Sequence, residues 1–544
     1  MNKIELGLSI CLLGTIIAGM KMTPAVQKLI PPQAYKIPKD VTVHHDTRID
    51  DYYWLKERDT QPVLDYLKAE NDYTFAKMKH TELLQKTLYN EMRGRIKEDD
   101  TTVPYKFGNY MYYTRTEENL QYDIYCRKLG NSSGDEEITL NMNEMAKKHD
   151  YIDLSAYKIS PNEKLLALTI DTSGAELHKL IVKDIKTGEI LDDHLSNLDG
   201  SVEWANDNKT LFYTVLDKAH RSYQLWRHEL GDEQSDDLLV LQEDDDRFSV
   251  GLHRTKSGEF LKMDLESQIT TEVYLLDRND PFGEWKLVQP REQGVEYYVY
   301  HHGNYLYQIT NKDAINFKMI RTTLKGGKED EIIPNRDKTT LDDVSMFKNH
   351  MAVLERIDGN LEIRLFNFED ESWYNIEMNE DIYSVTFEEN YDWNSDFFRF
   401  GYGSFKTPYC VYDIDFKTHK KTLRKKEEIL GGYESENYVS ERIWAPTHDG
   451  KKLAITLLYK KGIDLKGNNP CFLWGYGSYG ATYDPWFSSN IFSLVDRGMV
   501  YARAHIRGSS FMGRKWYLDG KLKQKKNTFE DFISAGRFLE NEGI

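Results

Sequence analysis

Residues 160–169 read Ser-Pro-Asn-Glu-Lys-Leu-Leu-Ala-Leu-Thr, and residues 205–214 read Ala-Asn-Asp-Asn-Lys-Thr-Leu-Phe-Tyr-Thr. In both stretches a polar turn leads directly into a run of mainly apolar residues. A turn built from Asn, Asp or Pro before such a run is typical of a β-strand that begins after a tight turn. The two stretches lie 45 residues apart, which indicates a repeated unit rather than a single hairpin.

The same turn-and-strand pattern recurs between residues 104 and 425. When the turns are aligned, one apolar position marks each repeat: Met111, Leu166, Leu211, Leu261, Leu306, Ala352 and Phe398. Successive positions are 45 to 55 residues apart, which is enough for about four short strands in each unit. The seven units predict a seven-bladed β-propeller over residues 101–428. The alternative is an irregular β-sandwich with fortuitous spacing.

After residue 428 the pattern changes to alternating strands and helices. We expect a hairpin, a strand, a short helix, a strand and an amphipathic helix, in that order: 438–459, 472–474, 491–495, 499–506 and 527–543. Asn527 or Thr528 is expected to cap the last helix, and Gly543 to end it. Strands and helices that alternate in this way predict the start of a parallel α/β sheet over residues 429–544.

The N-terminal hundred residues contain two further segments. Residues 1–20 carry Lys3 and then an apolar run, which is typical of a signal peptide or an N-terminal anchor. With such a signal the protein would be exported to the periplasm or the medium; without it we expect a cytoplasmic protein. Apolar residues at helical spacing predict a helix over 61–97, with Pro62 in its first turn.

Composition excludes several classes of protein. The 544 residues include 71 Lys and Arg and 89 Asp and Glu, so the formal net charge is −18 and nucleic-acid binding is disfavoured. Four cysteines exclude a disulfide scaffold, and Cys126, Cys410 and Cys471 are expected to be free thiols. The spacing of Cys and His residues supports no metal site, and we expect no cofactor.

Several motifs resemble those of one known family. They are Asp46–Leu55, Leu67–Tyr73, Ser440–Ala445 with Asp449–Gly450, Gly475–Gly480, Asp496–Gly498, His505–Gly508, Trp516–Tyr517 with Asp519–Lys521, and Lys526–Phe532. In these residues the chain resembles the prolyl oligopeptidase family of serine peptidases, and within it the oligopeptidase B branch. The resemblance extends over essentially everything after residue 30 and is most specific in the last hundred residues.

The resemblance implies a seven-bladed propeller set over an α/β-hydrolase domain, onto which the helical segment 21–100 packs. It also implies a serine oligopeptidase whose propeller excludes large folded proteins, so that short peptides are its substrates. Members of the oligopeptidase B branch cut after Arg or Lys, whereas prolyl members cut after Pro. From the negative net charge we expect no nucleic-acid partner, and we expect no stable membrane embedding beyond a possible N-terminal anchor.

Acyl transfer in an α/β-hydrolase needs a serine on a Gly-x-Ser-x-Gly elbow, followed by Asp and His. The sequence matches this elbow once, at Gly130-Asn-Ser132-Ser-Gly134. That match lies in a polar loop between two predicted strands with no helix after it, so we interpret it as a chance turn. We therefore expect the triad to be absent from this chain, and the hydrolase domain to be truncated before the elbow.

Three residues are candidates for the site. Tyr476 matches the family tyrosine whose phenol donates a hydrogen bond to the oxyanion, and its flanking glycines would let substrate approach. Tyr479 matches an aromatic position that lines the substrate pocket. Asp484 matches the first of two acidic residues that hold basic groups of substrates, while Trp486 replaces the second.

Two functions from different classes fit the sequence. The first is the N-terminal portion of a serine oligopeptidase, which by itself would be inactive. The second is a non-catalytic propeller protein that binds peptides. The first function requires a Ser, an Asp and a His from further residues of the same protein, whereas the second does not.

Overall fold

The computed structural model describes residues 29–130 and 134–544. The predicted signal or anchor segment and Ser132 lie outside the described residues. The chain forms two compact units, a smaller one that ends at Glu91 and a larger one from Met92 to Ile544. Among the described helices, none is both long enough and apolar enough to cross a membrane.

The smaller unit contains a two-stranded hairpin and a helical region, whose second helix ends three residues beyond Glu91. The hairpin pairs β1 (Lys39–Val43) with β2 (Asp46–Asp50). The helix predicted over 61–97 forms as two helices, α1 (Gln61–Met78) and α2 (Glu82–Gly94), separated by a 3-10 turn at Lys79–Thr81. Apolar periodicity continues across this turn, which explains why the sequence pattern predicts one helix.

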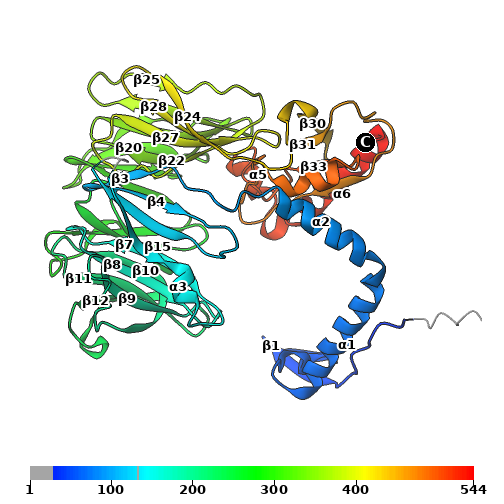
Figure 1. The fold of residues 1–544 in the computed structure, drawn as a ribbon, viewed down its shortest axis with the longest axis horizontal. Coiled ribbons are helices and arrows are strands. Elements are labelled where there is room, and N and C mark those ends of the chain that lie inside the picture. Colours follow the sequence, from blue (N-terminus) through cyan, green and yellow to red (C-terminus); the bar gives the residue numbers. More distant parts are fainter. Residues whose placement is uncertain (1–28, 131–133) are drawn as a thin grey trace, which may run out of the picture. The chain divides into compact units, whose positions relative to one another are not determined.

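The larger unit begins with β-sheets that follow one another along the chain, from light blue through green to yellow in Figure 1. Within the described residues, five four-stranded sheets and one seven-stranded sheet make up this region. Blade 1 and the seven-stranded sheet comprise β3 (Tyr105–Phe107), β4 (Tyr110–Arg115), β5 (Ile124–Leu129), β6 (Glu136–Asn141), β7 (Asp153–Ile159), β8 (Leu165–Asp171), β9 (His178–Asp184), β10 (Leu195–Trp204), β11 (Thr210–Leu216), β12 (Ser222–Glu229) and β13 (Leu238–Gln242). A short helix, α3 (Met142–Ala146), follows β6.

The remaining four sheets, blades 4 to 7, each contain four antiparallel strands in chain order. Their strands are β14 (Ser249–Arg254), β15 (Phe260–Glu266), β16 (Thr271–Asp277), β17 (Lys286–Gln289), β18 (Tyr297–His302), β19 (Tyr305–Thr310), β20 (Lys318–Thr323), β21 (Asp330–Ile333), β22 (Thr339–Met346), β23 (His350–Ile357), β24 (Asn360–Asn367), β25 (Trp373–Asn375), β26 (Ser384–Phe387), β27 (Phe397–Gly403), β28 (Cys410–Asp415) and β29 (Lys421–Lys426). Apolar residues buried between neighbouring sheets form the propeller core.

The seven-stranded sheet contains two blades that share β10. The first half of β10 pairs with β9, at Leu195 and Leu198, and its second half pairs with β11, from Val202 to Trp204. The described sheets therefore make seven blades, which confirms the predicted propeller. Each of the seven repeat positions lies on the second strand of its blade, and all but the partly buried Met111 are fully buried.

The last part of the chain forms a second, smaller sheet with the order β30-β31-β33-β32. Its elements are β30 (Tyr438–Pro446), β31 (Lys452–Lys460), β32 (Cys471–Trp474), α4 (Phe492–Val495), β33 (Val500–Ala504), α5 (Arg514–Leu518) and α6 (Lys526–Glu542). Only β32 and β33 pair in parallel among these strands, because β31 runs antiparallel to β33. This is the predicted partial α/β-hydrolase sheet.

The predicted end of α6 is confirmed, but its predicted cap is wrong. Gly543 has a φ of 77°, and its N–H donates to the carbonyl oxygens of the last turn. Asn527 and Thr528 lie inside the helix, because a 3-10 turn at Leu522–Gln524 leads the chain into α6 without a polar cap. Thr528 instead uses its hydroxyl for tertiary contacts.

Gly200 allows β10 to pass from one blade to the next. It has a φ of 108°, and a Cβ atom at this position would lie 2.3 Å from Ser155 Oγ. Gly231 has a similar φ of 95° but has no atom within 4 Å of the corresponding position. An alanine at position 231 would therefore add only backbone strain, whereas an alanine at position 200 would add backbone strain and a steric clash.

We predict that Gly231→Ala lowers the free energy of unfolding by about 1–2 kcal/mol, because only backbone strain is added. Gly200→Ala should cost about 1–3 kcal/mol more, because the methyl group also collides with Ser155. Urea denaturation monitored by circular dichroism measures both. Equal losses would show that the crossing of β10 does not need close packing at Gly200.

Candidate active site

The loop after β32 presents Tyr476 to solvent. The residue is 44% exposed, and within the part of the chain that the structure describes its phenol OH has no hydrogen-bond partner. Its ring lies 5.5 Å from that of Tyr483 in an edge-on arrangement. The phenol OH is therefore free to donate, and its ring is held from one side by an aromatic contact.

Glycines fix the backbone of this loop against the neighbouring strand ends. Gly477 has a φ of 62°, and a Cβ there would lie 2.6 Å from Thr528 Cγ2 and 2.8 Å from the Arg507 carbonyl oxygen. Gly508 has a φ of 94°, and its Cβ would lie 2.0 Å from the Gly477 carbonyl oxygen. These close approaches between backbones explain why only glycine fits at positions 477 and 508.

Two side chains from the start of α6 hold the same loop. Lys525 Nζ donates to the Gly477 carbonyl oxygen at 2.6 Å and to Ser478 Oγ at 2.5 Å. Thr528 Oγ1 lies 3.3 Å from the Gly477 carbonyl oxygen and 2.9 Å from that of Arg507. The position of Tyr476 is therefore set by α6 as well as by its own strand.

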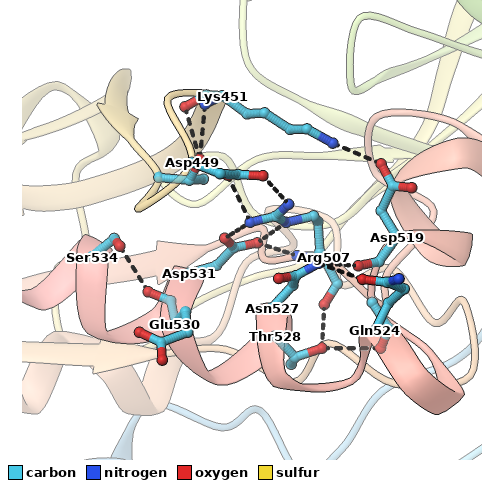
Figure 2. A network of polar contacts seen from close by, with 12 residues as sticks. Asp449, Lys451, Arg507, Asp519, Gln524, Asn527, Thr528, Glu530, Asp531 and Ser534 are labelled. Atoms are coloured by element: carbon cyan, nitrogen blue, oxygen red, sulfur yellow. Dashed lines mark hydrogen bonds and ion pairs between the residues drawn. The ribbon is translucent and has the colours of Figure 1, made fainter.

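Arg507 is the centre of the polar network drawn in Figure 2. Its guanidinium is 1% exposed and donates from Nε and Nη2 to the two carboxylate oxygens of Asp531, at 2.8 and 2.6 Å. On its other side it donates to both oxygens of Asp449, at 2.8 and 3.0 Å. The network thus joins the β30–β31 turn, the segment after β33 and α6.

The electrostatics of the network follow from these contacts. Hydrogen bonds from Arg507 hold the pKa of the Asp449 carboxyl well below its usual range. Burial acts to raise the pKa of Asp519, but hydrogen bonds from Lys451 and Lys515 outweigh it and lower that pKa. Asp449 and Asp519 are therefore ionised at neutral pH.

His448, Asp449 and Asp531 place potential ligand atoms within 4.8 Å of one another. The two carboxylates, however, both accept hydrogen bonds from Arg507. A cation already neutralises these oxygens, so their chemistry is that of a buried ion pair rather than of a metal centre.

Asp484 is buried and faces the propeller. Arg356, at the end of β23, donates to both of its carboxylate oxygens, at 2.6 and 3.0 Å. Arg503 Nη1 donates to its carbonyl oxygen at 2.6 Å. In this structure Asp484 links the hydrolase sheet to blade 6, and its predicted role in holding basic substrate groups stays a prediction.

The side chains of Trp486 and Tyr479 take no part in the Arg356–Asp484 ion pair. Trp486, which stands at the second acidic position, packs on blade 7, where its ring lies 5.5 Å from Tyr409 and within 3.2 Å of a Cβ built on Gly403. Tyr479 is 75% exposed and has a φ of 57°. The structure brings Tyr476 and Tyr479 onto one loop, and the pocket-lining role of Tyr479 stays a prediction.

His505 is a structural histidine. It is 4% exposed, its Nε2 lies 2.8 Å from Thr456 Oγ1, and its ring stacks on Phe511 with 3.6 Å between centroids. Burial, together with the charges of Arg442 and Arg503, lowers its pKa well below the usual value. The Ser509 hydroxyl donates its hydrogen bond to the Ile506 carbonyl oxygen rather than to a base that would activate it as a nucleophile.

Sequence reasoning missed Arg356 and the central position of Arg507. Arg356 is 128 residues from its partner in the chain, and no local pattern marks it. A signal was available for Arg507, since it directly follows the predicted buried strand 499–506, and a buried arginine requires carboxylate partners. The predicted motif residues Asp449 and Asp531 are those partners.

We predict that Asp531→Asn destabilises the chain by about 3–5 kcal/mol, because it leaves the buried Arg507 guanidinium without its fully buried counter-ion. Glu542→Gln on the same helix is the control, since Glu542 is 46% exposed and 4.0 Å from Lys466. That change should cost less than about 0.5 kcal/mol. Urea denaturation at pH 7 measures both, and similar losses would contradict a special role for Arg507.

We predict that the free energy of unfolding falls in mild acid because His505 is buried with a lowered pKa. Its folded pKa is below its unfolded value, so its contribution to stability is complete above pH ~6.5 and falls by about 1.4 kcal/mol per pH unit below it. His505→Gln should therefore lose about 1 kcal/mol less than wild type between pH 7.5 and 5.5. His448→Gln, at an exposed position, should behave as wild type; an unchanged pH dependence in both variants would refute the assignment.

Comparison with known proteins agrees with this architecture. The prolyl oligopeptidase N-terminal beta-propeller domain matches residues 32–427, and the prolyl oligopeptidase family matches residues 485–544. The chain is 35% identical to dipeptidyl aminopeptidase BI of Pseudoxanthomonas mexicana, covering 98% of this chain and 77% of that protein. It is 33% identical to protease 2 of Moraxella lacunata, covering 93% and 74%.

Among solved structures, oligopeptidase B from Leishmania major matches with a TM-score of 0.90 and 31% identity, covering 94% of this chain and 77% of that one. The match includes both the propeller and the partial hydrolase sheet. The chain belongs to the prolyl oligopeptidase family of serine peptidases, and it resembles oligopeptidase B in sequence and fold.

Proposed function

We propose that the chain supplies the propeller and the oxyanion donor of a serine oligopeptidase that hydrolyses short peptides. The observation that carries the proposal is the Tyr476 phenol, half-exposed and without a partner among the described residues, on a loop fixed by glycines and by α6. Such a preorganised hydroxyl donor suits the charge that develops on a carbonyl oxygen during acyl transfer.

The residues of this chain support one part of the reaction, the stabilisation of the oxyanion. When a serine attacks a peptide carbonyl, the carbonyl oxygen becomes an oxyanion, and the Tyr476 OH donates to it. Lys525 and Thr528 keep the loop in place, so little reorganisation accompanies the reaction. We propose that the nucleophile, its histidine base and the orienting aspartate belong to the part of the relatives' length that this chain does not span, since it covers 77% of the Pseudoxanthomonas protein.

Cleavage after Arg or Lys is the specificity that we propose, on the resemblance to oligopeptidase B. Asp484 is not available for a basic substrate group while Arg356 occupies both of its oxygens. The name of the Pseudoxanthomonas relative points to release of dipeptides instead. A substrate pair that separates internal cleavage from dipeptide release therefore belongs in the test.

The test joins this chain, at Ile544, to the aligned C-terminal part of Moraxella protease 2. We expect the chimera to hydrolyse an N-blocked Arg-Arg chromogenic peptide, and a serine-reactive inhibitor to abolish this activity. Tyr476→Phe should lower kcat by about 10²–10³-fold with little change in KM, because the phenol acts only on the oxyanion. The 544-residue chain alone should show no turnover.

Tyr483→Phe serves as the matched control, because it also removes a phenol OH close to the loop but leaves the Tyr476 OH intact. Its kcat should stay close to that of the parent chimera. A folded chimera whose kcat is unaffected by Tyr476→Phe would contradict the oxyanion role. If the chimera prefers a substrate with a free N-terminus from which it releases a dipeptide, the proposed endopeptidase activity is wrong and the activity is dipeptide release.

A further inference from the structure

The propeller contains a cavity of about 970 Å³ that lies outside the candidate active site. It is lined by the turns that join the first and second strands of several blades. We call this cavity the turn-side mouth. Its volume is in the range of small-molecule sites, and its walls include the rings of Tyr105, Phe107, Tyr391 and Trp393.

Two cations from one turn of blade 4 reach across the turn-side mouth. The Arg254 guanidinium lies 4.9 Å from the ring of Phe107 on blade 1. Lys256 Nζ donates to Ser345 Oγ on blade 6 at 3.0 Å and lies 3.1 Å from the centre of the Phe347 ring. Among the described residues, neither side chain has a carboxylate within ion-pair distance.

A third cation lies beside them. Arg278 is 4% exposed and donates only to the carbonyl oxygens of Trp204 and Gly258, at 3.0 and 3.1 Å. Burial, and then the neighbouring charge of Arg254, lowers its pKa to about 10. The charge of Glu203 acts in the opposite direction, but burial and Arg254 outweigh it.

The acidic side chains that line the turn-side mouth pair with other basic side chains of its lining, accept a hydrogen bond from a neutral group, or are exposed. Glu203 pairs with Lys158 at 2.5 Å, and Asp392 pairs with Lys106 at 2.9 Å. Glu388 accepts a hydrogen bond from Tyr409, and burial raises its pKa to about 7. Cations that lack carboxylate partners in a cavity of a chain with a net charge of −18 indicate that the missing anion comes from a ligand.

We propose that the turn-side mouth binds an organic carboxylate, held between Arg254 and Lys256, whose apolar group lies against the surrounding rings. Arg254 provides the planar, permanently charged donor that suits a carboxylate. Lys256, two residues further along the same turn, provides the second donor. The rings favour a ligand with an apolar group over a small inorganic anion.

The probe is N-acetylphenylalanine, and its carboxamide, N-acetylphenylalaninamide, is the matched neutral compound. Isothermal titration calorimetry with the full chain is carried out at pH 6.0 and low salt. Burial lowers the pKa of Lys256 to about 6, so about half of the amines carry a proton at this pH before binding. We expect the acid to bind with one site per chain and the amide not to bind.

Arg254→Met and Lys256→Met should each weaken binding of the acid by about tenfold or more, because each removes a charged donor. Arg254→Lys should keep most of the affinity. Lys417→Met, which removes an exposed cation in the β28–β29 turn, should bind as wild type. Circular dichroism and the thermal midpoint show whether each variant is folded.

Equal binding of acid and amide, or no binding of either, would overturn the proposal. It would also be overturned if folded Arg254→Met bound the acid as tightly as wild type. Inorganic phosphate is titrated in parallel. If phosphate binds as tightly as N-acetylphenylalanine and competes with it, the site takes anions in general and the assignment to an organic carboxylate is wrong.

Discussion

The buried guanidinium of Arg507 holds together three segments that are far apart in the sequence. It binds Asp449 on the β30–β31 turn and Asp531 on α6 while its own backbone touches the Gly477 loop. A charge at 1% exposure is tolerated only when it is fully paired. This requirement fixes the distance between the sheet and α6, and with it the loop that carries Tyr476.

The propeller is linked to this arrangement by a second buried pair. Arg356 on blade 6 binds Asp484, which lies a few residues beyond Tyr476 in the same connection. Phe511 extends the contact, since a Cβ on Gly359 of blade 6 would lie 2.4 Å from its ring. Blade 6 and the candidate site are therefore mechanically connected, so a change in propeller packing would reach the loop of Tyr476.

The sequence allowed the propeller, the hairpin at 438–459 and the end of α6 to be predicted, because each depends on local patterns: turn residues, apolar alternation and a glycine with positive φ. It did not predict the break in the helix at Lys79–Thr81, since apolar spacing continues across it. The partner of Asp484 could not be predicted either, because Arg356 reaches it only through tertiary packing. Tyr476 was found through a family motif, whereas its support by Lys525 and Thr528 depends on how α6 packs.

The central claim is that the Arg507 network positions the loop of Tyr476. Hydrogen–deuterium exchange, followed by mass spectrometry on the Asp531→Asn variant under native conditions, tests it most directly. The account predicts that peptides covering residues 475–481 lose protection, while peptides from blades 2 to 4 exchange as in wild type. A variant whose 475–481 peptides stay as protected as in wild type would contradict the claim.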